Sequence, residues 1–220
     1  MDLKHFGDSY DIVKKVLLQW LAPFGPWGVH PMFTHEVSDA EATKFSQFLG
    51  APVLSKRVLG LDSNRDEYLA ACGDCRSVFL DPDTGVRLHR RERRRASEFI
   101  FEDEVRALVR ARASGLVMVF DQSLPRGGER EQAQAKLDHF ARCDVAGFAY
   151  VSQACFLVLS ASRQLVDEAS NHVLRVSDLP EARVTHSVPS VDRRTLSGER
   201  HESPRGSSPR RGSGSERQWR

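Results

Sequence analysis

Apolar stretches of two lengths alternate along the first 185 residues, and this alternation constrains the fold more than any other feature. Longer stretches repeat apolar residues at helical spacing, as Val13 and Leu17 do between lysines. The predicted helices cover residues 8–21, 39–49, 101–113, 129–142 and 163–174. Short apolar runs between them are typical of buried strands. The predicted strands cover residues 27–33, 52–59, 77–80, 116–120, 147–152 and 155–160.

Strands that alternate with helices are typical of α/β proteins, in which helices cover both faces of a mostly parallel sheet. We therefore predict a Rossmann-like three-layer α/β sandwich over residues 1–185. The apolar runs at 148–151 and 156–159 are separated by too few residues for a parallel crossover. We expect them to form a hairpin, which gives a mostly parallel sheet with an antiparallel strand near its C-terminal edge.

The composition changes at about His186. Apolar residues become rare, and Ser-Pro-Arg occurs at 203–205 and again at 208–210. Such a segment buries too little surface to offset its chain entropy, so residues 186–220 are predicted to form a disordered basic tail. It carries eight arginines against four acidic residues, a charge of +4, and the whole chain has +2. Residues 1–185 are therefore slightly acidic, with a charge of about −2.

Three properties predict a cytoplasmic protein that makes no contact with a membrane. The longest apolar runs, such as 116–120, are far shorter than the roughly 18 residues of a membrane span. Residues 1–8 lack the apolar core of a signal peptide. The four cysteines are then expected to be reduced thiols. The sequence also contains no Gly-x-Gly-x-x-Gly, Walker A or Gly-x-Ser-x-Gly motif.

Carboxylates follow two of the predicted strands. Asp81 and Asp83 come directly after 77–80, and Asp121 comes directly after 116–120. Ligands of open α/β sheets bind beyond the carboxyl ends of the strands, so we predict these three aspartates as catalytic residues. Asp-Pro-Asp-Thr-Gly is also good turn chemistry, and a purely structural role stays open.

Arginines gather beside these aspartates. Arg87, Arg90 and Arg91 belong to a basic run that follows Asp83, and Arg126 follows Asp121. Guanidinium groups bind phosphates through two parallel hydrogen bonds, so these four arginines are predicted to bind a substrate, with nucleic acid as the partner. A solvated charged face is the alternative interpretation.

Cys72 and Cys75 have the spacing of half a zinc site. A tetrahedral site needs a second pair of ligands, and the sequence has no other Cys-x-x-Cys and no His-x-His. No resident metal site is predicted.

The order of several motifs resembles a known enzyme class. Asp11 and Lys14 form Asp-x-x-Lys in the first helix, Asp81-Pro82 follows an apolar strand, and a second strand and a terminal hairpin come later. This order resembles class I S-adenosylmethionine-dependent methyltransferases, especially the ribosomal-RNA adenine-N6 enzymes with their Asp-Pro-Pro-Tyr motif. The resemblance implies S-adenosylmethionine as cofactor. It places Asp8, Asp11, Lys14 and Pro82 at the cofactor site and Asp81 at the target amino group.

The leading prediction is therefore a methyltransferase-like protein that acts on nucleic acid, and three other interpretations stay open. Asp81-x-Asp83 also resembles the first motif of haloacid-dehalogenase-type phosphohydrolases, which use Mg²⁺. The three aspartates could instead hold Mg²⁺ in a nuclease. A non-catalytic binding module is the third interpretation, because no glycine loop follows 27–33. The chain also resembles uncharacterised bacterial proteins that carry Asp-Pro-Asp-Asn/Thr-Gly after a buried strand.

Overall fold

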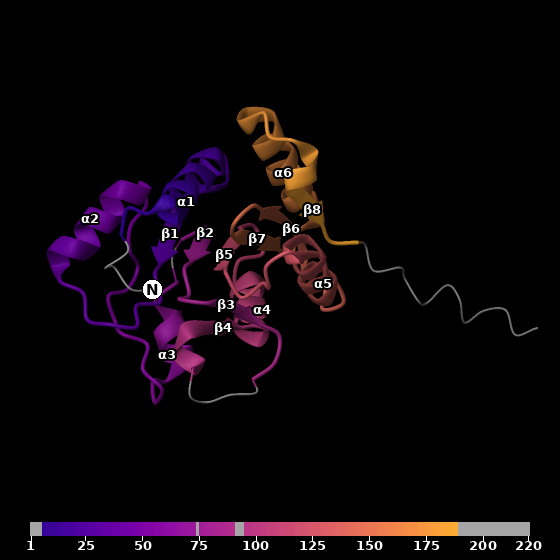
Figure 1. The fold of residues 1–220 in the computed structure, drawn as a ribbon. Coiled ribbons are helices and arrows are strands. Elements are labelled where there is room, and N and C mark those ends of the chain that lie inside the picture. Colours follow the sequence, from indigo (N-terminus) through magenta and orange to yellow (C-terminus); the bar gives the residue numbers. More distant parts are fainter. Residues whose placement is uncertain (1–5, 74, 91–94, 189–220) are drawn as a thin grey trace, which may run out of the picture. The chain divides into compact units, whose positions relative to one another are not determined.

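The computed structural model of the protein describes residues 6–73, 75–90 and 95–188. Contacts divide the chain into a unit that ends at Ser190 and a second unit, Val191–Arg220, and the described residues all belong to the first. This first unit is a mixed α/β structure built on a six-stranded sheet (Figure 1). Its strands are β1 (Trp27–His30), β2 (Ser77–Leu80), β5 (Val117–Asp121), β6 (Ala146–Val151), β7 (Cys155–Ser160) and β8 (Val184–His186).

Two kinds of pairing divide this sheet, whose order is β1-β2-β5-β7-β6-β8. β1, β2 and β5 pair in parallel, whereas β7 is antiparallel to both β5 and β6, and β8 is antiparallel to β6. Four of the six strands thus point the same way. The predicted hairpin is confirmed, but its antiparallel strand lies inside the sheet rather than near the edge, because β7 enters between β5 and β6. The edge position belongs to β8.

Helices cover both faces of the sheet, as Figure 1 shows. α1 (Ser9–Trp20), α2 (Asp39–Leu49) and α6 (Arg163–Ser177) contribute to one hydrophobic core. α3 (Arg65–Ala70), α4 (Glu102–Arg110) and α5 (Glu129–Ala141) contribute to a second core on the opposite face. Within β2 the side chains alternate between the two, since Phe79 joins the first core and Val78 the second. Strands covered on both faces read as continuous apolar runs, as they do here.

The predicted helix at 39–49 shows how local signals set an element's limits. Ser38 caps the helix and forms a reciprocal capping box with Glu41. Gly50 ends it with a left-handed backbone, at a φ of 73°. Sequence alone indicates the same positions, and α2 has these bounds.

The predicted strand at 52–59 is wrong. Only Val53 in this segment forms a bridge, in parallel with Val29 at the edge of the sheet. Val29 N–H donates to the Pro52 carbonyl, and Leu54 N–H donates to the Val29 carbonyl. Beyond these two bonds the segment continues in the same direction without further ladder pairing, and Leu59 N–H donates to the Phe33 carbonyl. The apolar content of this stretch therefore reflects packing rather than ladder formation.

Four elements have no counterpart in the prediction: α3, β8, and the two short strands β3 (Gly85–Arg87) and β4 (Phe99–Phe101). β3 and β4 pair in parallel as a separate two-stranded sheet. Each of the three strands has three residues, too few for a period-two pattern to be recognised.

The folded unit extends past the predicted boundary at residue 185. His186 belongs to β8, and Ser187 N–H donates to the Gly147 carbonyl. Ser187 Oγ also accepts a hydrogen bond from Arg163. The rest of the predicted tail, from residue 189, lies outside the described residues. Among the described helices, none is both long enough and apolar enough to cross a bilayer.

Candidate functional site

The carboxyl end of the parallel strands carries a buried cluster of Asp11, Lys14 and Asp81, hereafter the Lys14 cluster. Lys14 Nζ lies 3.0 Å from Asp11 Oδ1 and 2.9 Å from Asp81 Oδ2. The three side chains are 5% exposed or less. The structure thus brings together the helix and strand parts of the predicted cofactor and amino-group sites, although Asp81 is 67 positions from Lys14.

Local structure explains how α1 presents this cluster. The Asp8 side chain caps the helix by accepting from the backbone N–H groups of Tyr10 and Asp11. Asp11 and Lys14 are three positions apart and share the face that meets the end of β2. Asp11 Oδ2 also accepts from Gly7 N–H at 2.8 Å. The Lys14 ammonium lies 4.5 Å from the centroid of the Phe120 ring.

Burial and ion pairing act against each other in the Lys14 cluster. Burial alone would lower the pKa of Lys14, but the carboxylates of Asp81 and Asp11 raise it above its ordinary value. Burial raises the pKa of Asp81, and the ammonium of Lys14 only partly offsets this. Two carboxylates share one ammonium, so the cluster carries a formal charge of −1 when both are ionised.

Asp121 belongs to a second buried cluster, hereafter the Lys136 cluster. Lys136 Nζ on α5 lies 2.5 Å from Asp121 Oδ2 and also donates to the Val86 carbonyl and Ser123 Oγ. Asp121 Oδ1 accepts from Ser123 Oγ and from Val86 N–H. The Asp121 side chain is fully buried. Its carboxylate fastens β3 to the end of β5.

Gly85 allows this close approach. Its φ is 137°, a conformation that side chains with a Cβ rarely adopt. A Cβ on Gly85 would lie 2.1 Å from Asp121 Oδ1. The Asp-Pro-Asp-Thr-Gly segment therefore serves as a turn that lays β3 against Asp121, which is the structural alternative that its sequence indicated.

A buried histidine, His30, also lies at this end of the sheet, where β1 ends. Its Nε2 lies 3.2 Å from the Tyr68 carbonyl oxygen, while its Nδ1 has no hydrogen-bond partner within the described residues. Burial lowers the pKa of His30 to about 4. His30 is therefore neutral near pH 7. Its backbone carbonyl accepts from Asp81 N–H, which connects it to the Lys14 cluster.

The predicted catalytic aspartates do not form one open carboxylate site. Asp81 is bonded to Lys14 and Asp121 to Lys136, and each lysine supplies the positive charge that a bound cation would supply. Of the three, only Asp83 is exposed. Because a Mg²⁺ site needs several accessible oxygens, this arrangement does not favour the phosphohydrolase and nuclease interpretations.

The residues assigned to S-adenosylmethionine do not fit that cofactor in this conformation. Asp11 and Lys14 are bonded to each other and to Asp81. The exposed Asp8 uses a carboxylate oxygen as a helix cap, and Pro82 is buried. The segment after β1, where the resemblance would place a cofactor loop, is filled by the fully buried side chains of Met32 and Phe33.

Two of the four predicted substrate-binding arginines, Arg87 and Arg90, lie around β3 and β4. The guanidinium of Arg87 lies 3.8 Å from the ring centroid of Phe99, and that of Arg90 lies 4.5 Å from Phe101. Arg90 also pairs with Asp103 and Glu104. Arg95, which belongs to the predicted basic run, lies over the Phe99 ring, and Arg65, which was not predicted, lies over the Phe101 ring. Arg126 is exposed after β5, and Arg91 lies outside the described residues.

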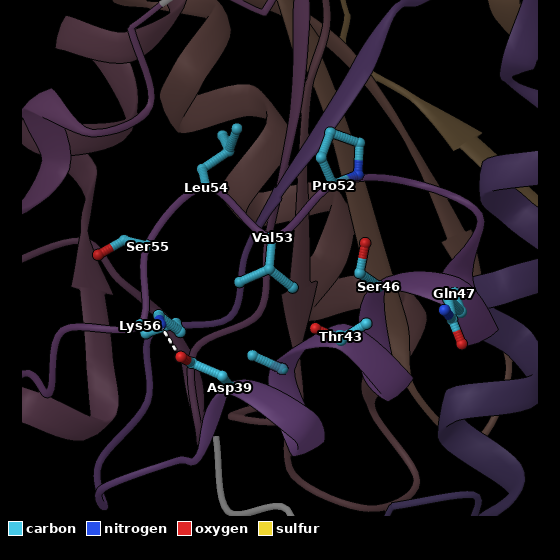
Figure 2. Close-up of a pocket in the computed structure, with 10 residues that line it drawn as sticks. Asp39, Thr43, Ser46, Gln47, Pro52, Val53, Leu54, Ser55 and Lys56 are labelled. Carbon is cyan, nitrogen blue, oxygen red and sulfur yellow. Dashed lines mark hydrogen bonds and ion pairs between the residues drawn. The ribbon is translucent and has the colours of Figure 1, made fainter.

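Two hollows lie beside α2. One, of about 520 Å³, is lined by α2 and the segment 52–56, and an ion pair joins Asp39 to Lys56 within it (Figure 2). The other, of about 610 Å³, has Trp27 of β1 in its wall and so lies at the amino end of that strand. The lining of these hollows contains none of the residues predicted for catalysis, cofactor or substrate.

The Cys72–Cys75 spacing does not identify the cysteine that lies beside other possible metal ligands. Burial raises the pKa of Cys72 to about 12, which makes this thiol unreactive. Cys143, in contrast, lies near Glu102 and His139, and the three form a possible metal-binding group that the sequence reasoning missed. The four-residue spacing of His139 and Cys143 was the available signal, because one further turn of chain after α5 brings both side chains to the same side.

Comparison with known proteins adds no assignment to these sites. No family model matches the chain, and neither a curated protein nor a solved structure is detectably similar to it.

Proposed function

We propose that this chain is a non-catalytic nucleic-acid-binding module that contacts phosphates through the arginines around β3 and β4. The observation that carries the proposal is the stacking of guanidinium groups on two phenylalanine rings. Arg87 lies over the Phe99 ring and Arg90 over the Phe101 ring, whereas Arg65, on the same Phe101 ring, is held by Glu104 and two backbone carbonyls. Stacking orders a planar guanidinium group before a phosphate arrives, which lowers the entropy lost on binding.

The charge of this region supports the same proposal. Four described arginines face three carboxylates here, which leaves a formal charge of +1; they are Arg65, Arg87, Arg90 and Arg95 against Glu98, Asp103 and Glu104. The sequence of 91–94 adds three arginines and one glutamate, a further +2. An excess of arginine within one segment of a slightly acidic domain is typical of a phosphate-binding region.

The state of the carboxylates supports a module without catalysis. Asp81 and Asp121, the residues best placed for chemistry at the strand ends, are both buried and paired with lysines. A general base or a metal ligand has to reach its substrate or its ion. In this conformation neither carboxylate does.

Fluorescence anisotropy with labelled single-stranded RNA and duplex DNA tests the binding proposal. In the Arg87→Gln/Arg95→Gln variant we expect weaker binding, and a salt dependence whose slope falls by about 0.7–0.9 for each phosphate that the variant no longer neutralises. Glutamine removes charge while keeping a polar side chain of similar length.

The matched control is Arg175→Gln/Arg183→Gln, which removes two exposed positive charges from α6 and the turn before β8. We expect this control to bind like the wild type. An equal loss of affinity in both variants would mean that net charge alone determines binding, and the proposed face would be wrong. Undetectable binding by the wild type would refute the function itself.

S-adenosylmethionine-dependent methyl transfer is the second candidate, and one contact favours it. Lys14 of the Asp-x-x-Lys helix touches Asp81 of the Asp-Pro segment, so an amino cation already lies against the residue that the resemblance assigns to the target amino group. For this function Lys14 would have to move away from Asp81, because the Asp81 side chain is only 1% exposed and a target amino group has to reach it.

Titration calorimetry of the full chain with S-adenosylhomocysteine separates the two candidates. Methyl transfer predicts micromolar binding that Asp11→Asn, at the predicted cofactor site, weakens and that Asp83→Asn, at an exposed aspartate, leaves unchanged. A wild-type titration without heat at two temperatures supports the non-catalytic module.

A further inference from the structure

Glu102, His139 and Cys143 converge between α4 and the end of α5. One potential ligand atom from each side chain lies within 4.8 Å of the other two. Glu102 is buried, and His139 and Cys143 are half-buried. Glu102 lies at the amino end of α4, and His139 lies near the carboxyl end of α5. The two helices of the second core therefore meet at this group.

The backbone explains the convergence. His139 lies in the last turn of α5, and Cys143 follows one turn later, where its N–H donates to the Phe140 carbonyl. The two side chains therefore point to the same side. Glu102 is the first residue of α4, and its Oε1 lies 3.6 Å from His139 Nε2.

The three donors differ in chemical type, and this mixture selects the metal. Mg²⁺ and Ca²⁺ prefer oxygen ligands alone, whereas Zn²⁺ accepts imidazole nitrogen, thiolate sulfur and carboxylate oxygen together. Tetrahedral zinc holds its ligand atoms about 3.5 Å apart, so side-chain rotations of about 1 Å would close this group around an ion.

A fourth donor stands beside the three. The ring of His89 lies 6.1 Å from the ring of His139, centroid to centroid, at an interplanar angle of 88°. His89 is exposed and comes from the segment after β3, so its ring can turn without disturbing a core. We propose that Glu102, His139 and Cys143 bind one Zn²⁺ ion and that His89 completes a tetrahedral site.

In the absence of metal, the guanidinium of Arg106 balances the negative charge of Glu102. Its guanidinium lies 3.1 Å from Glu102 Oε1, and its side chain is 26% exposed. When zinc binds, one cation replaces another beside the buried carboxylate, and Arg106 can move toward solvent. The carboxylate thus has a counter-charge in both states, which avoids the cost of an unpaired buried ion.

The test uses the full chain freed of metal with a chelator. Zn²⁺ is titrated in competition with a chromophoric chelator, and Co²⁺ serves as a spectroscopic probe. We expect one Zn²⁺ per chain, and a Co²⁺ spectrum with tetrahedral bands and a thiolate charge-transfer band. Cys143→Ser and His139→Gln are each expected to weaken binding by at least the roughly 10–100-fold that supporting residues of metal sites contribute.

Cys75→Ser and His172→Gln are the matched controls, because both alter half-buried side chains of the same types at other places. We expect them to bind Zn²⁺ like the wild type. Circular dichroism of every variant without metal distinguishes a defect in binding from a defect in folding. Unchanged affinity in Cys143→Ser, or a loss in Cys75→Ser, overturns the site, and unchanged affinity in His89→Gln overturns the fourth ligand. The site does not depend on the proposed nucleic-acid binding.

Discussion

The Lys14 and Lys136 clusters stand at the same end of the sheet and differ in their charge balance. Lys14 is shared by two carboxylates, so the cluster has one negative charge in excess when both are ionised. Lys136 has a single carboxylate and completes its bonding with a carbonyl and a hydroxyl oxygen. One cluster is charge-balanced, and the other is not.

This difference teaches that aspartates at neighbouring strand ends need not serve one function. Asp121 binds Lys136, Ser123 and Val86, and these contacts hold β3 to β5. Asp81 joins α1 to the end of β2 through Lys14. The contacts of Asp121 are structural, and both of its carboxylate oxygens accept hydrogen bonds. In the Lys14 cluster a second carboxylate, Asp11, also binds the lysine, so we expect the loss of the Asp81 charge to destabilise the fold less.

The largest expected effect comes from removing the charge of each aspartate in turn. Asp121→Asn leaves the buried Lys136 without a carboxylate, and we expect the free energy of unfolding to fall by about 3–5 kcal/mol. Asp81→Asn leaves Lys14 paired with Asp11, so we expect a loss of at most about 2 kcal/mol. Urea unfolding at pH 7 measures both values. Equal losses of unfolding free energy in the two variants would show that Asp11 does not compensate for the lost charge of Asp81.

A smaller effect tests the contact between β3 and Asp121. Gly85→Ala places a methyl group against Asp121 Oδ1, and we expect a loss of about 2–4 kcal/mol from the unfavourable φ and the overlap together. Gly127→Ala is the control, because Gly127 also has a positive φ, 82°, but open space around it. The control should cost only about 1 kcal/mol, as for a residue forced into a left-handed conformation. An equal loss of unfolding free energy in the two variants would show that the close approach of Gly85 to Asp121 is not the cause.

The smallest expected effect, about 2 kcal/mol between pH 7 and pH 5, concerns His30, which is buried at the same end and has no counter-ion among the described residues. Its pKa is about 4 in the folded protein and 6.5 in an unfolded chain. Below pH 6.5 the unfolded chain therefore takes up a proton that the folded protein does not. The stabilising contribution of the neutral imidazole is present above pH 6.5 and is lost as the pH falls toward 4, by about 1.4 kcal/mol per pH unit.

Urea unfolding at pH 7, 6 and 5 compares the wild type with His30→Phe and with His35→Gln, a change at an exposed histidine. The phenylalanine variant should lose stability less steeply on acidification, and the His35 variant should follow the wild type. Parallel pH curves for all three proteins would place the acid sensitivity elsewhere.

Much of the fold could be predicted from local signals. β2 and β7 have the predicted bounds because each is a continuous apolar run with a clear limit. α2 has them because Ser38, Glu41 and Gly50 are strong end signals. The strand predicted at 52–59 was wrong, because its apolar residues do not show that pairing with β1 stops after Val53.

Residue types and positions along the chain determined that Asp81 and Asp121 follow strands, that α1 carries Asp11 and Lys14, and that arginines follow β3. Only the tertiary structure decided which of these groups meet. Lys136, which neutralises Asp121, comes from α5, and Cys143 meets Glu102 across two helices. The charge state and access of a buried carboxylate depend on atoms within a few ångströms of it, and packing of distant segments selects those atoms.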